Sequence, residues 1–108
     1  MRTYVRKLYV GIDVHSREHV AAVIPISLLE LPGTLWGKVK PITIRNNIED
    51  FERLETAIRS HVLAPEEVAI AVDETGGHYS EPITYFLLTK GYSVYYLEAK
   101  ATKVAKER

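Results

Sequence analysis

The segment from Glu67 to Asp73 constrains the fold most strongly. Between these two acids lie five apolar residues, Val68-Ala69-Ile70-Ala71-Val72, with Pro65 before the segment and Gly76-Gly77 after it. A short, uninterrupted apolar run between turn residues is typical of a central strand that is covered on both faces. Such strands occur in parallel sheets, whose connections are usually helices. The sequence therefore predicts an α/β fold.

The other elements follow from periodicity and turn residues. Apolar and β-branched runs predict strands over residues 8–14, 19–26, 39–45 and 93–97. Asn46-Asn47 offers an N-cap for a helix that ends before Pro65, and Pro82 falls in the first turn of a second helix that ends at Lys90-Gly91. The first helix should bury one stripe of side chains: Ile48, Phe51, Leu54, Ile58 and Val62.

Two segments complete the expected order of elements. Residues 27–37 are too irregular for a helix and are expected to form an extended excursion, and residues 99–108 have the composition of a helix that the chain end interrupts. The order predicts a ribonuclease-H-like three-layer domain, with a mixed five-stranded sheet and flanking helices, truncated before the last helix. Sugar kinases and actin-type ATPases share this order, which alone cannot separate them.

Length and composition limit the class of protein. The 108 residues suffice for one domain over residues 1–108. The chain has no cysteine, which excludes disulfides and Cys-based zinc sites and is compatible with a reducing compartment. No apolar run approaches the roughly 18 residues of a membrane span, and no secretory signal is evident. We therefore expect a cytoplasmic protein with no membrane partner.

Charge is balanced overall but not along the chain. Residues 1–10 and residues 100–108 each carry a net charge of +3, so the residues between them carry −6. An acidic centre can hold cations while basic ends meet an anionic partner, although solvated tails have the same composition. The basic residues of the C-terminal end are candidates for nucleic-acid contacts: Lys100, Lys103, Lys106 and Arg108.

Carboxylates occur at the ends of two predicted strands. Asp13 lies in an otherwise apolar strand, where a carboxylate is costly unless it is paired, caps a turn or binds a metal. Asp73-Glu74 ends the apolar run that is expected at the centre of the sheet. In the predicted fold these two strands are parallel neighbours, so their carboxyl ends form one crevice that suits Mg²⁺ or Mn²⁺. Consecutive strand residues face opposite ways, so spacing alone leaves open whether Asp73 or Glu74 reaches it.

Histidine spacing gives no sign of a zinc site. His15 and His19 are four residues apart but straddle a predicted turn rather than lying on one helix face. We therefore expect no zinc ligation by this pair.

Three motifs together carry a family resemblance. They are Tyr9-Val10-Gly11-Ile12-Asp13-Val14-His15-Ser16, Asp73-Glu74-Thr75-Gly76-Gly77-His78-Tyr79 and Lys90-Gly91-Tyr92-Ser93-Val94. The chain resembles the N-terminal RuvC-like DEDD domain of insertion-sequence transposases, the family that includes the pilin-gene invertase. The resemblance implies that Asp13 is the first catalytic aspartate and Glu74 the catalytic glutamate. Both would bind Mg²⁺ or Mn²⁺ together with two aspartates that lie beyond Arg108.

The resemblance also implies a function and partners. The parent protein would cut and rejoin DNA at the ends of a mobile element, as a homo-oligomer, and its basic residues would contact DNA or a guide RNA. The chain ends before the last two aspartates and before the C-terminal domain associated with a serine nucleophile, so the isolated chain is expected to be inactive.

Two other functions remain open at this point. In an ATPase or sugar kinase the turn after Asp13 would hold Mg-ATP, but His15-Ser16-Arg17-Glu18 is not the small Gly/Thr-rich loop that phosphates need. In a non-catalytic interaction module, the apolar residues between Leu28 and Trp36 would form the contact surface.

Overall fold

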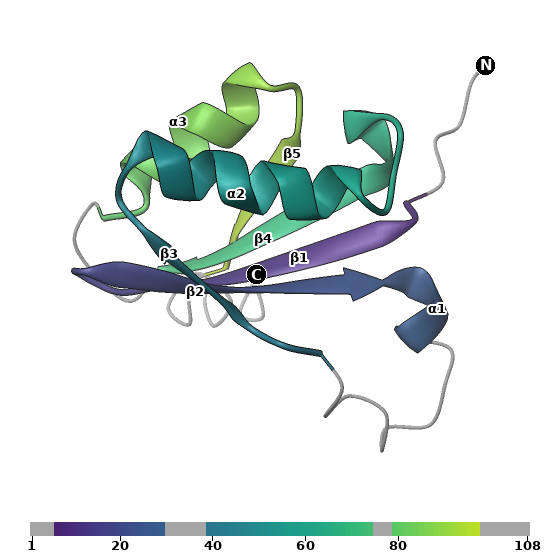
Figure 1. The fold of residues 1–108 in the computed structure, drawn as a ribbon, viewed down its shortest axis with the longest axis horizontal. Helices are drawn as coiled ribbons and strands as arrows, with labels where there is room; N and C mark the ends of the chain where they lie inside the picture. Colours follow the sequence, from purple (N-terminus) through teal and green to yellow (C-terminus); the bar gives the residue numbers. More distant parts are fainter. Residues whose placement is uncertain (1–5, 30–38, 75–78, 98–108) are drawn as a thin grey trace, which may run out of the picture.

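Five strands form one mixed sheet in the order β3-β2-β1-β4-β5 (Figure 1). The computed structural model describes residues 6–29, 39–74 and 79–97. The strands are β1 (Leu8–Val14), β2 (Glu18–Pro25), β3 (Ile42–Arg45), β4 (Val68–Glu74) and β5 (Ser93–Leu97). The helices are α1 (Ile26–Leu29), α2 (Ile48–Arg59) and α3 (Glu81–Thr89), and a 3₁₀ turn, η2, spans Pro65–Glu67. The predicted α/β class and mixed five-stranded sheet are confirmed.

Strand β1 is the centre of the sheet. It pairs antiparallel with β2 and parallel with β4, and β4 pairs parallel with β5. Every second residue of β1 is buried, beginning with Leu8 and ending with Val14. The alternation matches the period of two of a strand with one face in the core. The two predicted carboxyl-bearing strands are therefore parallel neighbours, as the sequence predicted.

Helices α2 and α3 both lie on the same face of the sheet (Figure 1). Asn47 caps α2 by accepting a hydrogen bond from the Asp50 amide at 2.8 Å. The helices bury an apolar stripe against the sheet, and the Phe51 and Phe86 rings meet at a centroid distance of 5.6 Å. Of the stripe predicted for the first helix, Ile48 is 55% exposed, because it is the first helical residue and lies at the rim of the layer.

The second face of the sheet is open in the described part of the chain. Val68, Ile70 and Val72 are buried, whereas Ala69 and Ala71 are half-buried and Asp73 is exposed. The prediction that this strand is covered on both faces therefore stays a prediction, because the described residues place helices α2 and α3 on one face alone. The sheet and the layer of α2 and α3 thus account for most of the described residues, and α1 lies apart from that layer, next to the end of β2 (Figure 1). The helix expected over residues 99–108 lies outside the described residues.

Two segments differ from the predictions. Ile26–Leu29 forms the one-turn helix α1, where Ile26 was expected to end a strand and residues 27–29 to begin an extended excursion. The Ile26 amide donates to the Lys7 carbonyl at 3.0 Å. This non-local contact is not visible in the local sequence. Strand β3 begins at Ile42, after Pro41, which has no amide hydrogen for the ladder. The rest of the expected excursion, residues 30–38, lies outside the described part of the structure.

The amino ends of β1 and β4 are joined by polar contacts. The Arg6 guanidinium donates to the carbonyls of Glu66 and Val68 at 2.7 and 3.0 Å. The Glu67 carboxylate lies 2.8 Å from the Lys7 ammonium and accepts from the amides of Leu63 and Ala64. These contacts, with the Lys7 bond the strongest, hold the pKa of Glu67 below its ordinary value. This end of the sheet is therefore fixed, and the opposite end is the one that carries the candidate site.

Candidate carboxylate site at the ends of β1 and β4

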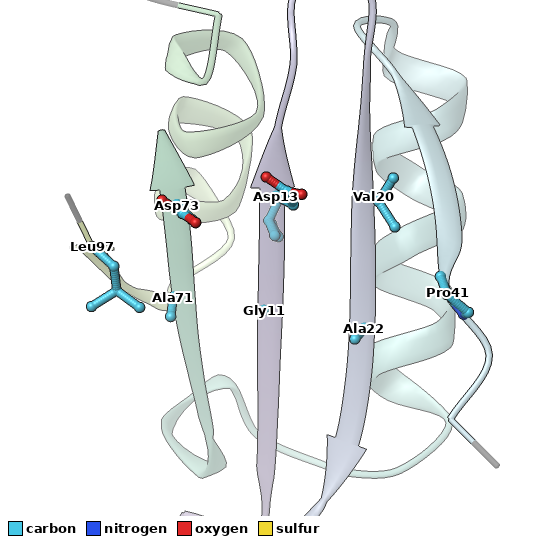
Figure 2. A pocket seen from close by; sticks show the side chains of 9 residues that line it. Gly11, Asp13, Val20, Ala22, Pro41, Ala71, Asp73 and Leu97 are labelled. Atoms are coloured by element: carbon cyan, nitrogen blue, oxygen red, sulfur yellow. The ribbon is translucent and has the colours of Figure 1, made fainter. Parts of the chain in front are cut away.

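Asp13 and Asp73 lie side by side on the open face of the sheet. The parallel register pairs Asp13 with Asp73, and both residues are exposed, whereas the preceding pair, Ile12 and Val72, is buried. Neighbouring strands are about 4.8 Å apart, so paired residues on one face bring their side chains together. Figure 2 shows both carboxylates at the carboxyl ends of their strands, on the same face. This is the edge at which α/β sheets bind ligands.

Small residues form the floor of a shallow pocket beneath these two carboxylates. Gly11 is paired with Ala22 on β2 and with Ala71 on β4, so three neighbouring strands present almost no side chain here (Figure 2). The pocket has a volume of about 300 Å³, and Val20, Pro41 and Leu97 line it as well. Asp13 and Asp73 thus lie at the edge of an accessible apolar pocket and are not enclosed in the core.

A histidine accompanies Asp13. The Nε2 atom of His15 lies 3.2 Å from Oδ2 of Asp13, and both side chains are about half exposed. His15 is the first residue after β1, so the backbone turns just beyond the carboxylate that it contacts. The contact gives Asp13 a defined partner, and it also places an imidazole next to the Asp13–Asp73 pair.

A second histidine of this region is buried, and the sequence did not predict its role. His19 has no exposed surface, and its two ring nitrogens contact the His15 amide and the Asn46 side chain. The alternation of β2, in which His19 and Ala21 share the buried face, is the sequence signal that could have indicated its burial. Its partners are set by the tertiary structure.

The predicted site residues have different places in the structure. Asp13 lies at the carboxyl end of β1, as expected. Glu74 is the last residue of β4 and the register partner of Val14, one position beyond the Asp13–Asp73 pair. Among the side chains that the structure describes, no three from His, Asp or Glu are grouped closely enough to hold a metal ion. The predicted nucleic-acid contacts lie outside the described residues: Lys100, Lys103, Lys106 and Arg108.

Comparison with protein families decides the relationship. Residues 10–108 match the family described as a transposase, namely the DEDD transposase domain of insertion sequences of the IS110 type. The chain belongs to this transposase family. The match includes Asp13, Asp73 and Glu74, so all the candidate carboxylates lie within the transposase domain. A search of curated proteins finds no match.

The family assignment bears on the alternatives. The match is to transposases and not to ATPases or sugar kinases, so the nucleotide-binding alternative gains no support. Of the apolar residues proposed as an interaction surface, Leu28 is half-buried and most of the others lie outside the described residues. Neither alternative is favoured by an observation. Among the described helices, none has the length and apolar character that crossing a membrane requires.

Proposed function

We propose that the carboxyl ends of β1 and β4 contribute the first two acidic ligands of the catalytic centre of a DNA transposase. The parent protein would cut and rejoin DNA at the ends of a mobile element. The observation that carries the proposal is the register pair Asp13 and Asp73, which places two carboxylates on one open face at the ligand-binding edge of the sheet. The family match supplies the reaction class.

The chemistry of the two side chains fits a hard divalent cation. Mg²⁺ and Mn²⁺ prefer carboxylate oxygens, and Asp13 and Asp73 present them from neighbouring positions on an accessible face. When bound, such an ion would activate the attacking oxygen and stabilise the leaving one. The protein residues would hold and orient the ion. Asp13 and Asp73 would supply oxygen ligands, and the His15 contact at 3.2 Å would set the direction of the Asp13 carboxylate.

The second ligand is the point at which two assignments compete. The family resemblance assigns the role to Glu74, and that assignment stays a prediction. The register favours Asp73, because Asp73 is paired with Asp13 and is exposed with it. We therefore propose Asp13 with Asp73 as the facing pair, and the experiment below includes Glu74 as the competing ligand.

The proposal extends to partners beyond the sheet. Lys100, Lys103, Lys106 and Arg108 would contact phosphates of DNA or of a guide RNA, which the net charge of +3 over residues 100–108 supports. The protein would act as a homo-oligomer in the cytoplasm. The absence of cysteine from the sequence is compatible with that compartment.

The ligand assignment can be tested by adding Mn²⁺ to the ¹⁵N-labelled chain and recording which amide resonances broaden. Because paramagnetic broadening falls steeply with distance, even weak binding is localised. We expect broadening centred on residues 12–14 and 72–73 in the wild type. Asp13→Asn and Asp73→Asn should each remove it, and Glu74→Gln should leave it in place. Glu52→Gln is the matched control, since Glu52 is an exposed acid on α2.

Two results would contradict the proposal in different ways. The absence of local broadening at the ends of β1 and β4 in the wild type would remove the metal site itself. Broadening that Glu74→Gln abolishes but Asp73→Asn preserves would keep the site and restore Glu74 as its second ligand.

A further inference from the structure

A histidine with no exposed surface lies directly behind the candidate site. His19 is the second residue of β2 and the register partner of Val14, so it belongs to the helix-covered face of the sheet. Asp13, one residue before Val14, belongs to the opposite face. The imidazole is therefore separated from the carboxylate pair by the thickness of the sheet, and it cannot touch a ligand bound there.

The hydrogen bonds of His19 define its chemical state. The His15 amide donates to Nδ1 at 3.3 Å, so Nδ1 acts as an acceptor and carries no proton. The ring hydrogen of the neutral imidazole then sits on Nε2, which donates to Oδ1 of Asn46 at 3.0 Å. Both ring nitrogens are thus satisfied only in the neutral Nε2–H tautomer. An apolar side chain of the same volume would leave both the His15 amide and the Asn46 side chain without this hydrogen-bond partner.

These two bonds join two segments at the end of the sheet that carries the candidate site. His15 follows β1, and its side chain contacts the Asp13 carboxylate. Asn46 precedes Asn47, the N-cap of α2. The imidazole therefore connects the turn that carries His15 to the loop that starts the main helix of the helical layer. The His19 imidazole therefore holds the turn from its buried side. The side chains of Asp13 and His15 lie on the other side.

We propose that His19 is a positioning residue for the site: as a neutral brace in the Nε2–H tautomer, it fixes the turn after Asp13 and thereby the direction of the Asp13 carboxylate and of His15. The part of this inference that concerns metal binding rests on the proposed function. The part that concerns the turn does not, because the hydrogen bonds belong to the protein alone.

Two substitutions separate the two bonds of His19. In His19→Asn the side-chain oxygen lies near the position of Nδ1, so it can still accept from the His15 amide, but the side chain is too short to reach Asn46. In His19→Gln the longer amide can donate to Asn46 from near the position of Nε2, but the turn no longer has an acceptor for the His15 amide. Both variants leave a smaller polar group in the core, so a merely structural role predicts similar behaviour for the two.

The experiment compares hydrogen exchange of the His15 amide and Mn²⁺ broadening at Asp13 in these variants. His19→Asn should keep both close to the wild type. In His19→Gln the His15 amide should exchange about tenfold faster, the effect of removing one ordinary hydrogen bond, and Mn²⁺ binding should weaken. Equal effects of the two substitutions, or faster exchange in His19→Asn than in His19→Gln, would overturn the inference.

A measurement on the wild type covers the case in which both variants unfold. The ¹⁵N chemical shifts of the His19 ring should show a protonated Nε2 and an unprotonated Nδ1. The opposite tautomer would overturn the inference by itself. If the wild type shows no Mn²⁺ broadening, the proposed metal site fails, while the exchange rate of the His15 amide still decides whether His19 fixes the turn.

Discussion

Replacement of Gly11 by alanine tests whether the floor of the site pocket is open. Gly11 lies in the middle of β1, and a Cβ atom added there meets no heavy atom within 4 Å. Among the described glycines only Gly91 has a positive φ, at 93°, so the backbone at Gly11 accepts an alanine without strain. The substitution adds no clash and reduces the conformational entropy of the unfolded chain.

The expected effect is therefore stabilising. Alanine at a glycine position of compatible conformation raises the free energy of unfolding by about 0.4–1 kcal/mol. For a domain near this size, the same change raises the Tm by roughly 2–8 °C. Urea unfolding followed by far-UV circular dichroism measures the first quantity, and a thermal scan on the same sample measures the second.

Gly91→Ala is the matched control for this substitution. Its Cβ would lie 3.5 and 3.6 Å from two Pro65 side-chain carbons, which is ordinary contact, but the φ of 93° is strained for alanine. A left-handed conformation costs a non-glycine residue about 1–2 kcal/mol, so this variant should be less stable than the wild type. If Gly11→Ala destabilised the chain as Gly91→Ala does, the pocket floor would be packed and the account of an open face would be refuted.

Two further predictions concern the Glu67 carboxylate and the basic residues of the C-terminal end. The lowered pKa of Glu67 means that its ionised form stabilises the fold above the ordinary glutamate pKa, and that this stabilisation is lost as the pH falls through the lowered value. In urea unfolding across the acid range, the free energy of unfolding should therefore fall less with decreasing pH in Glu67→Gln than in the wild type. The same pH profile in both proteins would contradict the stabilising role of ionised Glu67. The triple substitution Lys100→Ala/Lys103→Ala/Lys106→Ala should weaken DNA binding. It should also reduce the slope of the logarithm of the binding constant against the logarithm of the salt concentration by about 0.9 for each phosphate that the variant no longer neutralises. Equal affinity and equal slope in the wild type and the variant would show that these lysines do not contact DNA.

Local patterns were sufficient to predict most of the fold. The alternation of buried residues in β1 and the spacing of Phe51, Leu54 and Ile58 in α2 reflect the periods of a strand and a helix, which the sequence carries directly. The predictions failed where a tertiary contact decided the outcome. The bond between the Ile26 amide and the Lys7 carbonyl accompanies a helical turn where no local helix signal was found.

Part of the site could likewise be predicted from local patterns, and part of it depended on contacts between distant segments. Asp13 could be singled out because a carboxylate in an apolar strand is costly. The choice between Asp73 and Glu74 could not be made from spacing, because it depends on the register between β1 and β4, and a shift of one residue exchanges the two faces. The role of His19 was missed because its partner Asn46 is 27 residues away in the chain.

The central claim is that Asp13 and Asp73 face the same ion at the ends of β1 and β4. Crystals of the chain grown with Mn²⁺ would test it directly, because anomalous scattering from manganese locates the ion without reference to any assumed ligand. The account predicts an anomalous peak between the Asp13 and Asp73 carboxylates, and none in crystals of the Asp13→Asn variant. A manganese ion bound elsewhere on the chain, with these two carboxylates free of it, would contradict the account.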